Sequence, residues 1–381
     1  MIKKIIFLFL AWRLFLLFPL ILASNLLTNR QGYEYTLLTY FLGPENKLLS
    51  HFLLNPFGNF DAVYYLIIAA RGYTVEGGFF PLFPLSIFFT SAIFGKVLEL
   101  DITQYFASLG LVAIYFFISL ILMYKLIRMD YKESIVLWSI IFMLVFPTSF
   151  FFAAIYSESL FLLLSLGAFY FARKKNWFLA GLFGGLLTAT RIVGIAILPA
   201  LIYEFIKYEK QKSKIKTLSL FLIPMGLISY MIFNFFKWGN MFYFISAQGN
   251  FQNNRSVDAI IFFPQTIFRY LKIFQTISLT QYEWWVAFIE FSAFIFGSFM
   301  IYIAWKKKVR LSYLIFTITA FLIPISTGTF SGLPRYILPL FPIFIALALL
   351  KNKTPKFIYC IVSFMLLMIF FALFSKGYFI A

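Results

Sequence analysis

The sequence predicts an all-α membrane protein, a polytopic bundle of transmembrane helices formed by one domain over residues 1–381. Of its residues 62% are hydrophobic and only 12% are charged, whereas about a quarter of a typical soluble chain is charged. Apolar runs of roughly 20 residues recur from Ile5 to Phe374, and each can cross a hydrocarbon core about 30 Å thick. No stretch is left for a soluble catalytic domain of ordinary size.

The basic residues gather between the apolar runs, which indicates how the chain is oriented. The chain carries 32 Lys and Arg against 14 Asp and Glu, a net charge of +18 that in a soluble protein would suggest nucleic acid. Here the positive-inside rule accounts for the excess, so we expect no nucleic-acid partner. The clusters predicted to face the cytoplasm are Lys3/Lys4, Lys125/Arg128/Lys132, Arg173/Lys174/Lys175, Lys207 to Lys216, Lys306/Lys307/Lys308/Arg310 and Lys351/Lys353/Lys356.

Placing every cluster inside predicts about eleven spans, within a range of 10–13, and puts residue 381 outside. The first run lacks a clear small-residue cleavage site, so we interpret it as a retained span rather than a signal peptide. The apolar segments 79–98 and 259–279 would break the charge rule if each crossed once, and either could be re-entrant or interfacial. The predicted spans are 5–27, 102–126, 134–155, 159–172, 177–190, 192–206, 217–236, 284–305, 311–328, 335–350 and 357–375.

The first outer loop, 28–78, contains a predicted helix over 59–73. We expect it to lie in the outer interface, with Asp61 in its first turn and Gly72 as its stop. The apolar residues that recur there at helical spacing form one stripe, made of Phe60, Tyr64, Ile67 and Ile68.

The second outer loop, 237–282, is rich in polar residues. Together they suffice to bind a hydrophilic ligand. They are Asn250, Gln252, Asn253, Asn254, Arg255 and Asp258.

Few residues in the chain are suited to metal or redox chemistry. Cys360 is the one cysteine and His51 the one histidine, which excludes an intramolecular disulfide and a cluster of His ligands. No DxD pair, P-loop, CxxC or HExxH is present. We therefore expect no cofactor and no metal, although Asp61 could in principle share a divalent ion with Glu76 or Glu158.

Three blocks resemble a known family. FDAVYYLIIAARGYTVEGGFFPLFPL (60–85) resembles the first block of the PIG-V family of integral-membrane mannosyltransferases, which add the second mannose to GPI anchors, and of their prokaryotic relatives. The segment 146–204, with Tyr-Ser-Glu and an Arg-x-x-Gly turn, looks like the second block. GLPRYILPLFP (332–342) is similar to a Pro-Arg-Tyr element of glycosyltransferases with the GT-C fold.

The resemblance implies a GT-C-type bundle and inverting transfer of a hexose from a polyprenyl-phosphate or dolichyl-phosphate donor. It places a general base in the first outer loop. Phe60 stands where the family usually has Trp, and 190–194 lacks the polar residues that often follow the arginine of the eukaryotic members. The lipid- or glycan-linked acceptor is therefore left open, and GPI-like glycolipid synthesis is one option.

Asp61 is the candidate catalytic base, because a carboxylate can accept the proton of an attacking hydroxyl while a phosphate leaves unaided. Its alternative role is that of a dipole partner at a helix start. Arg191 and Arg335 are candidates for the donor phosphate, since the guanidinium group can donate two hydrogen bonds to two oxygens, and their alternative role is interfacial anchoring.

Glu158 lies at the outer end of two apolar runs, where an ionisable group is costly unless paired or wetted. It could orient an acceptor hydroxyl or an arginine, or form a structural pair with Arg191 or Arg269. Two further substrate-binding candidates from the resembling blocks are Glu76 and Tyr156.

Two classes without chemistry compete with the enzyme. A secondary transporter or lipid flippase would be expected to show internal repeats and polar groups near the membrane midplane, and the ionisable residues here lie mainly at span ends. A non-catalytic membrane scaffold would have been favoured by the loss of Asp61, which is present.

Overall fold

The computed structural model describes residues 1–42, 47–48, 50–93, 102–211, 213–251, 256, 259 and 261–380. Within these ranges the regular structure is helical, with no strand. The predicted all-α class is therefore confirmed. The elements are α1 Ile2–Phe15, α2 Leu17–Leu26, η1 Glu34–Thr36, α3 Leu38–Leu42, η2 Asn55–Gly58, α4 Asp61–Arg71, α5 Leu82–Ile93, α6 Ile102–Arg128, α7 Glu133–Leu144, η3 Ser149–Phe152, α8 Glu158–Arg173, α9 Trp177–Thr188, η4 Ile192–Ala196, α10 Ile197–Tyr208, α11 Lys214–Ser219, α12 Leu222–Trp238, α13 Tyr243–Ser246, η5 Ala247–Phe251, α14 Phe263–Thr276, α15 Tyr282–Lys306, α16 Leu311–Ile325, α17 Leu333–Ile337, α18 Phe341–Ala348 and α19 Lys353–Ser375.

The long helices are apolar enough to cross a membrane. Among the described residues five helical stretches qualify by length and composition, and four shorter apolar helices accompany them. The protein is accordingly a multi-pass membrane protein, while the number of eleven spans stays a prediction. The five long stretches are Ile2–Leu26, Ile102–Arg128, Lys214–Trp238, Tyr282–Lys306 and Lys353–Ser375.

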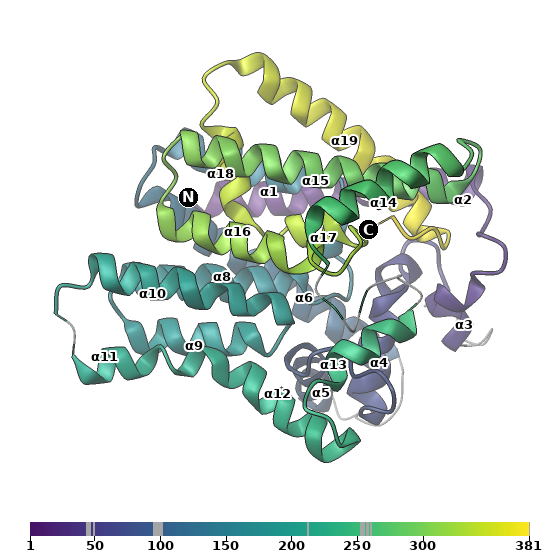
Figure 1. Cartoon of the computed structure of the whole chain (residues 1–381). Coiled ribbons are helices and arrows are strands. Elements are labelled where there is room, and N and C mark those ends of the chain that lie inside the picture. Colours follow the sequence, from purple (N-terminus) through teal and green to yellow (C-terminus); the bar gives the residue numbers. More distant parts are fainter. Residues whose placement is uncertain are drawn as a thin grey trace.

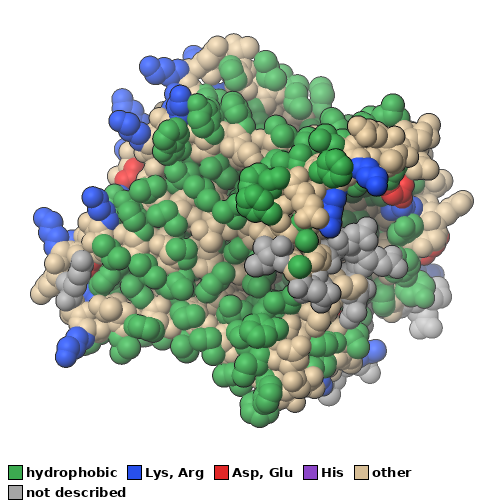
Figure 2. Space-filling view, in the orientation of Figure 1, with side chains coloured by type: hydrophobic (Ala, Val, Ile, Leu, Met, Phe, Trp, Pro, Cys, Tyr) green, Lys and Arg blue, Asp and Glu red, His purple; other side chains and the backbone are tan. Residues whose placement is uncertain are grey.

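Charge is distributed along the bundle as the positive-inside rule predicts. Figure 2 shows hydrophobic side chains across the middle of the visible face and Lys and Arg along its left edge. In Figure 1 the same edge holds the N-terminus, the end of α10 and the start of α11, whereas α4, α13 and α17 lie toward the other side. The basic edge is thus the expected cytoplasmic side.

Several predicted spans are interrupted. The predicted span 134–155 becomes α7 followed by an irregular stretch and η3, and 335–350 becomes α17 and α18. Pro147 and Pro339 stand at these breaks, and a proline has no backbone N–H to continue a helix. Irregular backbone at membrane depth is tolerated because neighbouring helices cover it, and η3 is fully buried.

The two ambiguous apolar segments contain helices too short to cross a membrane straight. The segment 79–98 contains α5, whose 12 residues span about 18 Å, and residues 94–98 lie outside the described part. The segment 259–279 contains α14, whose 14 residues span about 21 Å. The apolar face of α14 leaves Phe268 and Leu271 exposed, as expected of a helix in the interface.

The helix expected over 59–73 is present as α4, and its place in the outer interface stays a prediction. Asp61 occupies its first turn and Gly72, with φ of 78°, ends it, as predicted. The helix packs against α5 and η2, so more of its residues meet protein than the one apolar stripe accounts for. Its most buried face includes Ala62 and Ala69, whose small side chains allow close packing, whereas Tyr64 on the expected stripe is only partly buried.

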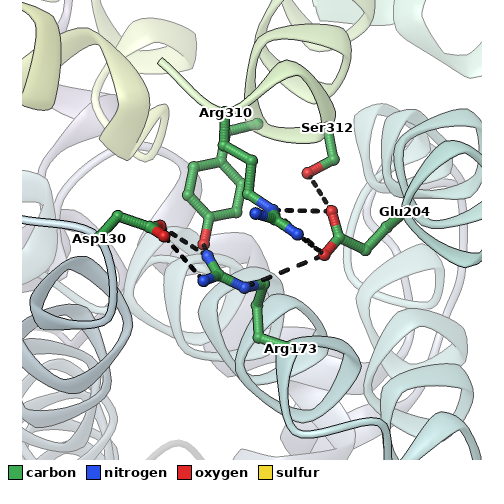
Figure 3. A network of polar contacts seen from close by, with 6 residues as sticks. Asp130, Arg173, Glu204, Arg310 and Ser312 are labelled. Carbon is green, nitrogen blue, oxygen red and sulfur yellow. Dashed lines mark hydrogen bonds and ion pairs between the residues drawn. The ribbon is translucent and has the colours of Figure 1, made fainter. Parts of the chain in front are cut away.

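A network of ion pairs ties the basic end of the bundle together (Figure 3). Arg173 donates to both carboxylate oxygens of Asp130, at 2.6 and 2.8 Å, and to the hydroxyl of Tyr313 at 2.9 Å. Arg310 donates through Nε and Nη2 to Glu204, at 2.9 and 2.5 Å. The residues come from α8, α10, α16 and the turns after α6 and α15, so the network joins the helix ends at this side.

Cysteine labelling tests the orientation. In a chain whose Cys360 is replaced by Ser, cysteines at Val75 and Leu279 should react with a membrane-impermeant maleimide from outside, because both side chains are exposed beyond the outer ends of the helices. Cysteines at Lys174 and Lys307, in basic turns, should react only after the membrane is opened. The reverse pattern in intact cells would contradict the orientation.

Candidate functional site

The backbone that presents Asp61 is held in an unusual conformation. Phe60, at the N-cap of α4, has φ of 57°, which a bulky residue rarely adopts. Its N–H donates to the carbonyl of Thr36 at 2.8 Å, and its ring packs on Phe374 and Phe379 with centroids 4.9 and 5.1 Å away. The surrounding contacts therefore fix the turn that aims Asp61.

The hydroxyl group of Tyr156 supports the same turn. Its hydroxyl donates to the carbonyl of Asn59 at 3.0 Å and accepts the backbone N–H of Asp61 at 3.2 Å. The ring is 1% exposed and does not line the cavity described below. Tyr156 thus contacts the turn that carries Asp61, and its contact with substrate stays a prediction.

Four charged side chains from distant parts of the sequence form an alternating chain, here called the ion cluster: Asp61, Arg335, Glu158 and Arg191. Arg335 pairs through Nη1 with Oδ2 of Asp61 at 2.6 Å and through Nε with Oε1 of Glu158 at 3.2 Å. Arg191 donates from Nη1 to the same Oε1 of Glu158. Of the two partners considered for Glu158, Arg191 is therefore found, and Arg269 instead donates to the carbonyl of Gly328.

The members of the ion cluster differ in their access to water. The Glu158 side chain is 1% exposed, Arg335 9% and Arg191 11%, whereas Asp61 is 27% exposed. Two arginines face two carboxylates, so the ion cluster is neutral when all four groups are ionised. Asp61 is the member that a ligand reaches most easily.

The ion cluster borders a cavity of about 1010 Å³. Asp61, Arg191 and Arg335 line it. Glu158 is not one of the described residues that line the cavity. The rest of the lining mixes aromatic, aliphatic and small polar residues. It includes Tyr64, whose pKa is raised by burial and secondly by the nearby Asp61 carboxylate. The phenol of Tyr64 therefore stays protonated at neutral pH and can act as a hydrogen-bond donor.

Other predicted residues lie away from the ion cluster. The Glu76 carboxylate accepts the backbone N–H groups of Thr74 and Val75, at 2.8 and 3.0 Å, and closes its own loop outside the cavity lining. The polar residues Gln252, Asn253, Asn254, Arg255 and Asp258 lie outside the described residues, as does the side chain of Asn250.

Sequence reasoning missed one charged residue of the cavity. Arg30 lines it, together with Tyr33 and with Phe379 from beyond α19. The sequence did contain a signal for Arg30. It is a cation at the outer end of the first span, where the positive-inside rule disfavours basic residues.

The described residues contain no group of three or more His, Cys, Asp or Glu side chains arranged to hold a metal ion. The carboxylates nearest the cavity, Asp61 and Glu158, both face Arg335. Transfer without a metal stays a prediction.

The role of Tyr156 can be tested by removing its hydroxyl. Tyr156→Phe leaves the backbone N–H of Asp61 without its partner, while the Asn59 carbonyl keeps the N–H of Ala62 at 3.4 Å. An unpaired buried group costs about 1–3 kcal/mol, so the melting temperature should fall by several degrees. Transfer should fall too, because Asp61 loses its support. Tyr170→Phe is the matched control, since the Tyr170 hydroxyl has no hydrogen bond within the described part of the chain. Equal melting temperatures for both variants would contradict this role.

Comparison with solved structures returns a distant likeness. Two chains of the Archaeoglobus fulgidus oligosaccharyltransferase are 12% identical to this one: the complex with zinc and sulfate, with a TM-score of 0.43 over 81% of this chain, and the apo form, with 0.48 over 97%. This chain covers 45% and 56% of those chains, about half their length. No curated protein matches the sequence.

The comparison with protein families is more direct. The family model described as Mannosyltransferase (PIG-V) matches residues 2–243, more than half of the chain. The match includes α4 with Asp61, Glu158 at the start of α8 and Arg191 at the turn after α9. The chain therefore belongs to the PIG-V mannosyltransferase family.

Proposed function

We propose that the protein transfers a hexose, most simply mannose, from a polyprenyl or dolichyl phosphate to a hydroxyl of a lipid- or glycan-linked acceptor. Inversion at the anomeric carbon is part of the proposal, with Asp61 as general base. The observation that carries it is the partly exposed carboxylate of Asp61 on the wall of a cavity that Arg191 and Arg335 also line.

In the proposed step Asp61 accepts the proton of the acceptor hydroxyl while its oxygen forms a bond to the anomeric carbon. The bond from that carbon to the phosphate oxygen breaks, and the lipid phosphate leaves with the electron pair. A phosphate needs little help from an acid, so one carboxylate suffices.

The contacts of Asp61 fit this role. Arg335 engages Oδ2, and Oδ1 has no hydrogen-bond partner among the described residues. One oxygen is thus held in place while the other is left to accept a proton. Such fixed geometry is what general-base catalysis requires, since the base must lie within hydrogen-bond reach of the proton it removes.

The site lies away from the basic edge of the bundle (Figures 1 and 2). With that edge at the cytoplasm, the reaction takes place on the outer or lumenal face of the membrane. A donor with a membrane-embedded tail would present its sugar and phosphate at this level.

The two arginines of the ion cluster were expected to clamp the donor phosphate. Their ion pairs support a different use, in which Arg335 holds Asp61 and Arg191 holds Glu158. An added phosphate beside this neutral group would meet two carboxylates as well as two cations. We therefore propose that Arg335 acts mainly on the position of the base.

Asp61→Asn tests the base. The variant keeps the size of the side chain but cannot accept the proton, so transfer should fall about 100-fold or more while the fold survives. Asp130→Asn is a matched control, because Asp130 is also paired with an arginine at 2.6 Å and is 24% exposed, against 27% for Asp61. Mass spectrometry of the lipids formed from a panel of polyprenyl-phosphate hexoses measures transfer. Near-normal transfer by a folded Asp61→Asn protein would contradict the proposal.

Lysine replacements separate positioning from phosphate binding. Lysine keeps the charge but lacks the planar guanidinium whose Nη1 meets Asp61 and whose Nε meets Glu158. Arg335→Lys should therefore lower kcat substantially and leave KM for the donor nearly unchanged. Arg191→Lys should have a smaller effect of the same kind. A raised KM for the donor with normal kcat, in either variant, would favour the phosphate clamp instead.

A further inference from the structure

A third arginine of the cavity lies outside the ion cluster. Arg30 follows α2 at the outer end of the first membrane stretch and lines the cavity. Its guanidinium lies over two tyrosine rings, with its central carbon 3.6 Å from the Tyr33 centroid and 4.1 Å from that of Tyr282, and Tyr378 is 5.7 Å away. We call these three rings the tyrosine cage. It fixes the planar group, as arginine stacking on aromatic rings commonly does.

Arg30 has hydrogen-bonding capacity to spare. Nη2 contacts Oε1 of Glu283 at 3.3 Å, and neither Nε nor Nη1 has a partner within the described ranges. The Arg30 side chain is only 15% exposed, whereas Glu283 is 58% exposed. Water screens so open a carboxylate, so the positive charge of Arg30 is less compensated by its partner than the charges of Arg191 and Arg335 are by theirs.

Reaction geometry also separates Arg30 from the base. In an inverting displacement the phosphate leaves from the face of the sugar opposite the attacking oxygen, so the base and the phosphate lie on opposite sides. Arg335, at 2.6 Å from Asp61, is on the side of the base. A cation for the leaving phosphate has to stand elsewhere on the cavity wall.

Phe379 connects the two regions of the wall. Its ring centroid is 6.0 Å from the central carbon of Arg335, and its backbone carbonyl accepts a hydrogen bond from the hydroxyl of Tyr282 in the tyrosine cage. The backbone N–H of Arg30 donates to the carbonyl of Lys376 at 2.8 Å. The stretch after α19 thus anchors Arg30 and lines the cavity between it and the ion cluster.

We propose that Arg30 and its tyrosine cage bind the phosphate of the lipid-linked donor. This rests on the proposed function, which supplies a prenyl-phosphate donor. The sugar extends from Arg30 along Phe379 toward Asp61. The exposed aromatic residues Tyr35 and Phe41, which also line the cavity, suit the interface where lipid phosphates lie.

Binding of geranyl phosphate to the purified full chain tests the site. Arg30→Gln should raise the Kd for geranyl phosphate by about 10-fold or more, because charge-assisted hydrogen bonds are lost. The Kd for geraniol, which has no phosphate, should stay unchanged. Inorganic phosphate in competition shows whether the headgroup alone is recognised. Arg71→Gln is the control, since Arg71 is exposed at the end of α4 and does not line the cavity.

The Glu283→Gln variant controls for an effect on folding that comes from loss of the ion pair. It removes the same ion pair as Arg30→Gln but keeps the guanidinium, so it should bind geranyl phosphate as tightly as the wild type or more tightly. If Glu283→Gln weakens binding as much as Arg30→Gln does, Arg30 is a structural partner and the proposal is overturned.

The outcomes also separate this proposal from the function on which it rests. Unchanged geranyl phosphate binding in Arg30→Gln, with transfer lost in Asp61→Asn, overturns the Arg30 site and leaves the glycosyl transfer intact. Binding that depends on Arg30 in a protein that transfers no hexose supports the phosphate site and contradicts the proposed function.

Discussion

Arg335 can be buried in this protein only because two carboxylates meet it there. Its side chain is 9% exposed and lies between Asp61 and Glu158. Removing one partner of a buried ion pair typically costs about 3–5 kcal/mol, because the remaining charge is left uncompensated. The pairing therefore joins α4, α8 and α17, and the same contacts that stabilise this end of the bundle hold the proposed base. Stability and chemistry depend here on one group of charges.

Both ends of the bundle use arginine–carboxylate pairs, with different consequences. At the basic end Arg173 and Arg310 engage Asp130 and Glu204, in a network that ties helix ends together (Figure 3). At the other end the pairs border a cavity of about 1010 Å³, and one carboxylate remains accessible. The difference that matters for function is thus the cavity rather than the presence of ion pairs, which is why charge patterns alone do not locate the site.

Much of this organisation could be predicted from the sequence. Composition predicted the membrane class, helical spacing predicted α4 with Asp61 in its first turn, and the break between apolar runs placed Arg191 at a turn. The convergence of Asp61 with Arg335 could not be predicted, because no local pattern specifies contact between such distant residues. The same holds for the tyrosine cage, which unites residues from both ends of the chain. The packing of α4 against α5 and η2 could not be predicted either, because an apolar stripe suits lipid as well as protein.

The central claim is that the donor lies in this cavity with its anomeric carbon toward residue 61 and its phosphate on the opposite side. Cryo-electron microscopy of the Asp61→Asn protein with a prenyl-phosphate mannose tests it most directly. The account predicts the sugar against Phe379, with the phosphate at Arg30 and room for an acceptor hydroxyl beside Asn at position 61. A phosphate in contact with residue 61, or a sugar bound outside the cavity, would contradict it.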